Sequence, residues 1–238
     1  MSKIYEALER AGFEAKLPSM PSPVIPMKKR LPIAPRIEIE ERMIGIAEAL
    51  IPDNRMKIIQ FLGSRSGEGT STVVRQFAGI SALKMHKSVL VLDADRIHPV
   101  QHDLFGVDHE ECLNEVTVDG GPIERAFCQV SYPGLSLCLV SGNSVSPSQV
   151  LNGHGIWEML KVRFDLVLID SPPLEVSSDG LALARYADGV VLVIEAEKTR
   201  GPVVENLKHS VLEYGGNILG VVLNKRRYYI PQWIYKWL

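Results

Sequence analysis

The 238-residue chain has few cysteines, no long hydrophobic run and almost no net charge. Its three cysteines, Cys112, Cys128 and Cys138, show no Cys-x-x-Cys spacing, which disfavours a disulfide scaffold or a zinc knuckle and favours a reducing compartment. No apolar run approaches the ~20 residues of a membrane-spanning helix. The net charge of −2 excludes a globally basic nucleic-acid-binding protein, although it leaves room for a local basic patch. The first ten residues alternate charged and apolar side chains, which is not the pattern of a signal peptide.

The prolines are unevenly distributed. Six of the 15 lie between Pro18 and Pro35, so this segment can be neither a helix nor a central strand. We expect an extended linker over residues 13–36. Residues 1–12 predict a short amphipathic helix, which is marginal alone and should dock on another surface. A second amphipathic helix is predicted over residues 38–51.

From residue 56 onward, short apolar runs alternate with helical stretches. Nearly continuous Val, Ile and Leu runs suit strands that are covered on both faces, as in a parallel sheet. The alternation favours a doubly wound α/β sheet, in which ligands bind beyond the carboxyl ends of the strands. The predicted strands are Ile58–Leu62, Val89–Leu92, Leu135–Val140, Leu166–Ile169, Val190–Ile194 and Ile218–Leu223. The predicted helices are 71–86, 148–163, 177–186 and 202–214.

The first predicted strand runs into GSRSGEGTST (63–72), where a glycine-containing turn leads directly into a helix. Gly67 and Gly69 allow positive φ angles and close approach of a ligand to the backbone. Successive N–H groups at the positive end of a helix then face one concavity, which suits phosphate. Ser71 stands where a phosphate-binding loop places its magnesium-binding hydroxyl. The alternative is a plain strand–helix turn that uses glycine for tightness.

Three carboxylates follow two other predicted strands. Asp93 and Asp95 lie two residues apart on a segment expected to be extended, so both should point the same way. Asp170 closes a third apolar strand just before two prolines. Such acids can hold magnesium directly or through water, or accept a proton from a hydroxyl nucleophile. Each alone could be an ordinary capping residue, but three acidic strand ends beside a glycine loop favour a phosphate and metal site.

These segments resemble the bacterial tyrosine kinases (BY-kinases) of exopolysaccharide and capsule synthesis, which are P-loop ATPases related to MinD and ParA. Within that family, the short exosortase-associated type is the most similar. The resemblance covers residues 56–225 and the N-terminus, and it implies a MinD/ParA-like P-loop NTPase domain over 37–225 with an N-terminal helical extension. The similar segments are MSKIYEALERAG (1–12), GEGTST (67–72) as Walker A, VLVLDADRIHP (89–99) as Walker A′, PGLSLCLVSGNSVSPSQVL (133–151), DLVLIDSPP (165–173) as Walker B, ADGVVLVIEAEKTR (187–200) and GVVLNKRRYYIP (220–231).

The resemblance implies ATP and Mg²⁺ as cofactors and gives roles to the matching residues. The magnesium shell would contain Ser71, Asp93 and Asp170, and Asp95 would help to deprotonate a tyrosine. The residues around the phosphates would be Ser66, Gly67, Glu68, Gly69, Thr70, Ser71 and Thr72. The candidates for autophosphorylation in the aromatic and basic tail, residues 226–238, are Tyr228, Tyr229 and Tyr235.

One departure from the family pattern concerns catalysis directly. Thr70 stands where a Walker A loop has lysine, which offsets charge during phosphoryl transfer. Losing that contact would cost on the order of 2–4 kcal/mol in the transition state. Chemistry would slow roughly 30- to 1000-fold, while binding could survive through amides and magnesium. Arg65 matches the second lysine of the MinD/ParA class and could supply the charge, in cis or to a neighbouring subunit; the alternative is a solvated loop arginine.

Two other motifs also depart from the pattern. In the Walker A′ sequence Asp-x-Asp-x-Arg, Ile97 takes the arginine position and Arg96 is shifted by one. The family's Glu-x-x-Arg-x-x-Arg interface appears as Glu41, Ile44 and Ala47, without either arginine. The ring assembly of such kinases is therefore not implied, although a homo-oligomer remains an option.

Three functions are compatible with the sequence. The first is an ATP- and magnesium-dependent tyrosine autokinase that regulates exopolysaccharide synthesis and export. The second is a catalytically inactive, nucleotide-dependent regulator or adaptor of a membrane polysaccharide co-polymerase (chain-length regulator), which Thr70 favours over the first. The third is a MinD/ParA-like positioning ATPase, which the Walker A′ and Walker B segments disfavour.

The expected location follows from the missing membrane span. We expect a cytoplasmic protein that a partner holds at the inner membrane. The tail could pack on its own domain, lie at a membrane interface or enter a partner's groove. No nucleic-acid partner is expected, because an aromatic and basic cluster this small is weak evidence for one.

Overall fold

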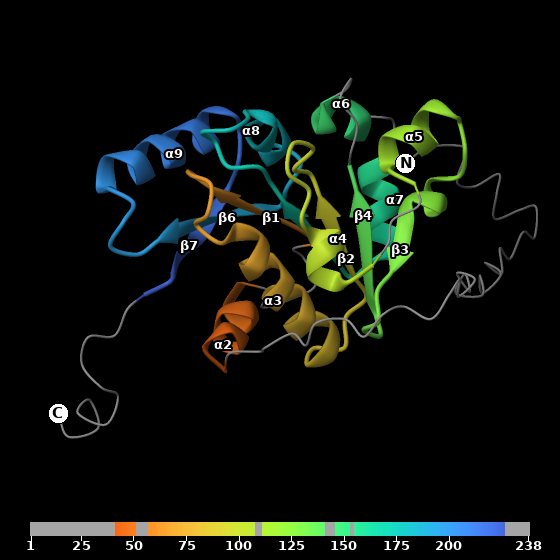
Figure 1. Ribbon diagram of the computed structural model, residues 1–238, viewed down its shortest axis with the longest axis horizontal. Coiled ribbons are helices and arrows are strands. Elements are labelled where there is room, and N and C mark those ends of the chain that lie inside the picture. The colour runs from red at the N-terminus through yellow and green to blue at the C-terminus, as the bar shows by residue number, and fades with distance from the viewer. Residues whose placement is uncertain (1–40, 51–56, 108–110, 141–145, 153–154, 227–238) are drawn as a thin grey trace, which may run out of the picture. The chain divides into compact units, whose positions relative to one another are not determined.

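The computed structural model describes residues 41–50, 57–107, 111–140, 146–152 and 155–226 (Figure 1). The predicted docking helix, the proline-rich linker and the tail from residue 227, with its three tyrosines, lie outside the described residues. Predictions about these segments therefore stay predictions.

A seven-stranded sheet forms the centre of the fold, in the order β3-β4-β2-β5-β1-β6-β7. All neighbouring strands are parallel except β3 and β4, which confirms the predicted doubly wound, mostly parallel α/β sheet. The strand β3 was not predicted because it has three residues, too few to show a hydrophobic period. The strands are β1 (Ile58–Gly63), β2 (Val89–Asp93), β3 (Phe127–Gln129), β4 (Leu135–Leu139), β5 (Leu166–Asp170), β6 (Gly189–Glu195) and β7 (Ile218–Asn224).

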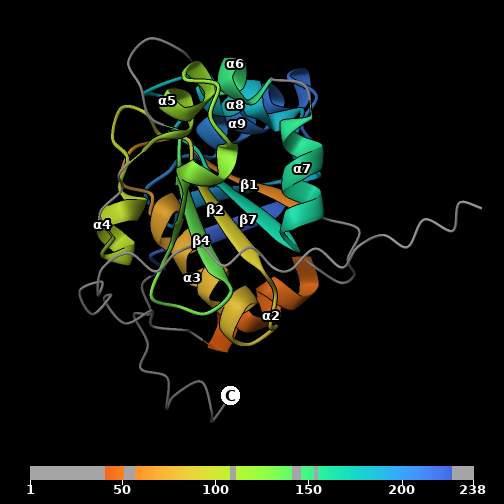
Figure 2. The same ribbon diagram turned by 90° about the vertical axis from the view of Figure 1, so that its right-hand side faces the viewer.

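Helices cover both faces of this sheet. One face is covered by α2 and α3, whereas α7, α8 and α9 lie on the other (Figures 1 and 2). Among the described helices, none is both long enough and apolar enough to cross a membrane. The helices are α2 (Glu41–Leu50), α3 (Thr70–Leu83), α4 (Gln101–Phe105), α5 (Leu113–Val118), the 3₁₀ helix η1 (Ile123–Ala126), α6 (Pro147–Leu151), α7 (Ile156–Arg163), α8 (Asp179–Ala184) and α9 (Gly201–Glu213).

The prediction of one helix over 148–163 is wrong, because two helices, α6 and α7, occupy this stretch. Gly155 precedes α7 with a φ of 85°, in the left-handed region that a helix interior does not adopt. The short helices α4 and α5 were also not predicted, because five or six residues are too few for a helical period to stand out.

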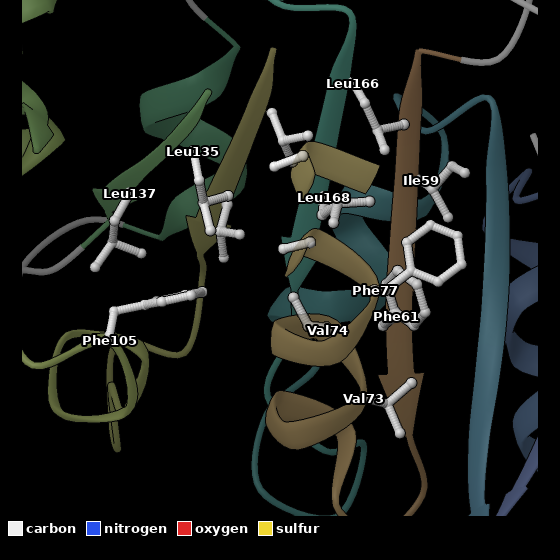
Figure 3. Packing of buried hydrophobic residues seen from close by; sticks show 14 of the residues in the cluster. Ile59, Phe61, Val73, Val74, Phe77, Phe105, Leu135, Leu137, Leu166 and Leu168 are labelled. Carbon is white, nitrogen blue, oxygen red and sulfur yellow. The ribbon is translucent and has the colours of Figure 1, made fainter. Parts of the chain in front are cut away.

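Packing of α3 against β1 holds both ends of the glycine-containing turn in place. All six residues of β1 are buried. The rings of Phe61 in β1 and Phe77 in α3 meet edge to face, with centroids 5.3 Å apart (Figure 3). Val73 and Val74 lie one turn before Phe77 and bury the start of the same helix. Truncating Phe77 to alanine would cost about 3–5 kcal/mol and would release the helix that carries the turn.

Candidate functional site

The glycine loop, residues 63–72, joins β1 to α3 at the carboxyl edge of the sheet. Gly67 and Gly69 have φ angles of 82° and 91°, as the sequence predicts for a turn that needs glycine. Gly69 is also closely packed, because a Cβ atom there would clash with the side-chain amide of Asn224. Glycine at position 69 is therefore favoured by its backbone angle, and a side chain there would also displace the Asn224 amide.

Several backbone N–H groups of the glycine loop have no acceptor among the described residues. The first backbone bond of α3 runs from the N–H of Val73 to the carbonyl of Gly69, at 3.0 Å, and no side chain caps the helix. Unpaired N–H groups at a helix N-terminus, after left-handed glycines, can bind an anion such as phosphate. The amides without an acceptor are those of Gly67, Gly69, Thr70, Ser71 and Thr72.

Glu68 faces the protein rather than the concave side of the loop. Its buried carboxylate accepts hydrogen bonds from the backbone N–H of Ser64 at 2.6 Å and of Arg65 at 2.9 Å. The hydroxyl of Thr199, in the connection between β6 and α9, also donates to it at 2.5 Å. These bonds occupy the carboxylate, and the backbone N–H of Glu68 donates to the carbonyl of Arg65 at 3.5 Å, so the predicted phosphate contact of Glu68 is not among the loop's free N–H groups.

Thr70 takes the position of the Walker A lysine, and Arg65 is its candidate substitute. Neither residue places a positive charge against the glycine loop. The Thr70 hydroxyl lies against the end of β1, where a Cβ atom added at Gly63 would come within 2.8 Å of it. The Arg65 side chain is exposed, and its guanidinium has no partner in the described part of the chain.

Lys225, which sequence reasoning missed, places an amine on the glycine loop. It follows β7 with a left-handed φ of 55°. Its amine donates to the carbonyl of Gly67 and lies 3.5 Å from a carboxylate oxygen of Glu195. The neighbouring Asn224 donates to the carbonyl of Glu68 at 2.8 Å. The residues at the end of β7 therefore hold the loop through two of its carbonyls and bring a positive charge to it.

Asp93 and Asp170 end the neighbouring strands β2 and β5, and they are paired in register. Each residue is 1% exposed. One oxygen of Asp93 accepts from the backbone N–H of Val100 at 3.1 Å and of Gln101 at 3.0 Å, and the other accepts from the backbone N–H of Asp95 at 3.2 Å. Two buried carboxylates, termed the acid pair below, therefore lie side by side at the edge where the glycine loop emerges.

The buried surroundings of the acid pair raise the pKa of both carboxylates and so disfavour two negative charges. Burial, together with repulsion from Asp170, raises the pKa of Asp93 to about 8. Burial also raises the pKa of Asp170 to about 6, against hydrogen bonds from the side chains of Gln101 and Ser71 that lower it. A divalent cation would relieve both effects, because it offsets the charge in the buried space.

The donor set fits magnesium. Two carboxylates and the Ser71 hydroxyl are hard oxygen ligands of the kind that Mg²⁺ takes together with water and phosphate oxygens. The described residues hold no group of three or more His, Cys, Asp or Glu side chains placed to share a metal ion. Water and nucleotide oxygens would therefore have to complete any magnesium shell here.

Asp95 does not extend the strand as predicted. The strand β2 ends at Asp93, and one oxygen of Asp95 accepts from the backbone N–H of Ile97 at 3.1 Å and of His98 at 2.9 Å. Asp95 therefore lies beyond the end of β2, just before the bend at residues 96–98. The charge of Asp95 still contributes to the raised pKa of both acids in the pair, so it lies nearby.

Gln101, the first residue of α4, was also missed from the sequence. It is fully buried, and its side-chain amide donates to Asp170 at 2.7 Å and to the carbonyl of Ser71 at 3.0 Å. One residue thus connects the acid pair with the first turn of α3.

The remaining family positions differ in their surroundings. Arg96 donates to Asp179 of α8 at 2.8 Å, whereas Ile97 is 46% exposed. Ala47 of α2 is fully buried in the core, and Ile44 packs against the same core. The side chain of Glu41 lies outside the described set.

Comparisons with known proteins find relatives of the chain among bacterial tyrosine kinases. No protein-family model matches the chain. The chain is 26% identical over 197 residues to CapB of Staphylococcus aureus, covering 80% of this chain and 86% of that protein. It is also 26% identical over 178 residues to the tyrosine-protein kinase YwqD of Bacillus subtilis, covering 74% and 75%.

Solved structures show the same fold. The chimerical protein CapA2B2 superposes with a TM-score of 0.72 at 22% identity, over 79% of this chain and 85% of that one. MinD of Pyrococcus horikoshii, solved with Mg-ADP, superposes with a TM-score of 0.59 at 20% identity, over 76% of each chain. The chain is a homologue of the tyrosine-kinase relatives CapB and YwqD, on a P-loop fold that it shares with CapA2B2 and MinD.

Proposed function

We propose that the protein binds ATP and Mg²⁺ as a tyrosine autokinase-like regulator of exopolysaccharide or capsule synthesis and export, with phosphoryl transfer weakened at Thr70. The observation that carries this proposal is the meeting of two complementary features at one edge of the sheet. The glycine loop offers unpaired N–H groups for phosphate, and the acid pair offers buried carboxylates for a cation. Together they suit the negative phosphates and the positive magnesium ion of a magnesium–nucleotide complex.

In this proposal each residue has a defined task. The backbone N–H groups of residues 67 and 69–72 bind phosphate oxygens, and Lys225 adds positive charge beside Gly67. Ser71, Asp93 and Asp170 hold the magnesium ion, which when bound offsets charge on the phosphates. Asp95 is the candidate base, since one of its carboxylate oxygens has no hydrogen bond among the described residues.

The acceptor hydroxyls would come from Tyr228, Tyr229 and Tyr235. A tyrosine hydroxyl gives up its proton as its oxygen attacks the terminal phosphorus atom of ATP, and ADP leaves. Without a Walker A lysine, less positive charge meets the phosphates in the transition state, so transfer should be slow even where binding is normal.

A catalytically inactive, nucleotide-dependent regulator is the second candidate. The exposed position of Arg65 and the lack of a lysine at residue 70 favour it. In both versions the partner would be a membrane polysaccharide co-polymerase, which would hold the protein at the cytoplasmic face of the inner membrane. The CapA2B2 chimera, whose name joins CapA to CapB, makes a CapA-type protein the first partner to test. A MinD-like positioning ATPase is the remaining alternative, supported only by the shared fold.

The test uses purified full-length protein, labelled ATP and magnesium, with and without the cytoplasmic segments of the partner. Nucleotide binding and phosphotyrosine are measured on the same samples, with Asp170→Asn as the control that should lose magnesium-dependent binding. Binding with slow phosphotyrosine formation supports the autokinase-like function, and binding without phosphotyrosine selects the inactive regulator. Absence of both signals would contradict both versions.

A further inference from the structure

Gln101 makes hydrogen bonds to both carboxylates of the acid pair. Its backbone N–H donates to Asp93, and its side-chain amide donates to Asp170 and to the carbonyl of Ser71. One residue therefore touches both carboxylates and the helix turn that carries the predicted magnesium-binding hydroxyl. The second atom of the same amide, Oε1, is buried and has no donor among the described residues.

A buried amide oxygen without a donor lowers stability unless water or a ligand supplies a hydrogen bond. An unpaired oxygen alone does not identify a ligand site, because Gln60 in β1 also has a buried Oε1 without a donor in the described part of the chain. The difference lies in what each amide holds. The amide of Gln60 donates to Ser171 at 2.8 Å and to the carbonyl of Gly180 at 2.6 Å, and contacts neither carboxylate.

We propose that Gln101 is a positioning residue of the magnesium site, a role that rests on the proposed function. Its amide N–H group holds Asp170 beside the first turn of α3, and its backbone holds Asp93. Its free oxygen accepts a hydrogen bond from a water molecule in the shell of the bound cation. Groups that orient metal ligands in this way affect metal affinity almost as strongly as the ligands themselves.

The chemistry of glutamine suits this task. A lysine in the same place would compete with the cation for both carboxylates, and a glutamate would add a third negative charge to a buried space that already disfavours two. A neutral amide can donate to the acid pair and accept from bound water at the same time. Leucine would fill similar volume but could do neither.

The experiment compares Gln101→Leu with the matched control Gln60→Leu in the full chain. Each replacement removes one fully buried amide with one unpaired oxygen, but only the first touches the acid pair. Binding of Mn²⁺ alone is measured by electron paramagnetic resonance, and binding of a fluorescent ATP analogue is measured with EDTA and with magnesium. Circular dichroism checks that each variant is folded.

We expect Gln101→Leu to weaken Mn²⁺ binding roughly 10- to 100-fold, the range seen when groups behind a metal's ligands are removed. Nucleotide binding in EDTA should stay unchanged, and Gln60→Leu should leave both affinities unchanged. Equal Mn²⁺ affinities in the two variants would overturn the proposal.

A second variant tests the same role in case Gln101→Leu does not fold. Gln101→Asn keeps a neutral amide but is one methylene shorter, so its N–H should no longer reach Asp170, and Mn²⁺ binding should weaken. Unchanged Mn²⁺ affinity in that variant would also overturn the role. Wild-type protein that binds neither Mn²⁺ nor nucleotide would instead overturn the proposed function itself, so the two failures are distinguishable.

Discussion

The two halves of the candidate site, the glycine loop and the acid pair, are built by different means. The acid pair is buried at the ends of adjacent parallel strands, where the register of the sheet fixes both carboxylates. The glycine loop is exposed from Arg65 to Gly67 and is held by contacts from distant segments, through Glu68 and Lys225. The half proposed to bind a cation has both of the carboxylates expected from the sequence resemblance, whereas the half proposed to bind phosphate has Thr70 where that resemblance leads us to expect lysine.

This difference indicates that the residues of the glycine loop can change more easily than those of the acid pair. Moving a carboxylate of the acid pair would disturb the centre of the sheet. The charge on the glycine loop can come from any element that reaches it, and Lys225 is placed to supply part of it. We therefore expect cation binding to dominate nucleotide affinity in this chain.

The largest expected effect is a gain of function. Thr70→Lys restores the family's cation at the position where charge develops during transfer. We expect phosphotyrosine formation to rise roughly 30- to 1000-fold, with a smaller change in nucleotide affinity. Phosphotyrosine is followed over time with labelled ATP, and Thr72→Lys, two residues along the same helix, is the control for added charge. No gain with Thr70→Lys would mean that the missing lysine does not limit the reaction.

The second effect concerns stability and pH without magnesium. Because burial raises the pKa of Asp93 to about 8, its neutral form stabilises the fold. That contribution is complete below the unfolded-state pKa of about 3.9 and is lost as the pH rises through about 8. Asp93→Asn, which cannot ionise, should melt at a higher temperature than the wild type at pH 8 and lose that advantage near pH 4. Melting curves across this range check it; identical pH profiles would show that Asp93 is not held neutral.

A third, smaller effect should come from the amine beside the loop. Lys225→Ala should weaken nucleotide binding about three- to tenfold, since a charged contact at a partly exposed site is worth around 1 kcal/mol. Lys198→Ala is the matched control, because Lys198 pairs with the same Glu195, at 3.1 Å. Fluorescence titration with an ATP analogue measures both. Equal losses would assign the effect to Glu195 rather than to the glycine loop.

The smallest effect is expected at Arg65. Its exposed side chain has no partner in the described residues, so Arg65→Ala should change nucleotide affinity by less than about twofold. The same titration measures it, with turnover followed in parallel. A large loss of either would support the hypothesis that Arg65 supplies phosphate charge, in cis or to a neighbouring subunit.

The sequence predicts the parts of the site whose position is set by the ends of the sheet's strands. The strands that end at Gly63, Asp93 and Asp170 are nearly continuous apolar runs, and parallel strands bring their carboxyl ends to one edge. Asp95 lies past the end of β2, a boundary that an apolar run alone does not show.

Gln101 and Lys225 were missed for another reason. Gln101 contacts Asp170, 69 residues away, and Lys225 contacts Gly67, 158 residues away. No local pattern marks a side chain whose role depends on such long-range contacts. Only the folded sheet brings these residues to the glycine loop and the acid pair.

The most direct test of the account is the affinity of the wild-type protein for an ATP analogue, measured with magnesium and again with EDTA. Asp170→Asn is measured in parallel as the variant with an incomplete acid pair. The account predicts that the wild type binds the analogue with magnesium, that EDTA weakens this binding strongly, and that Asp170→Asn shows little difference between the two conditions. Wild-type binding that is absent in both conditions, or equal in both, would contradict it.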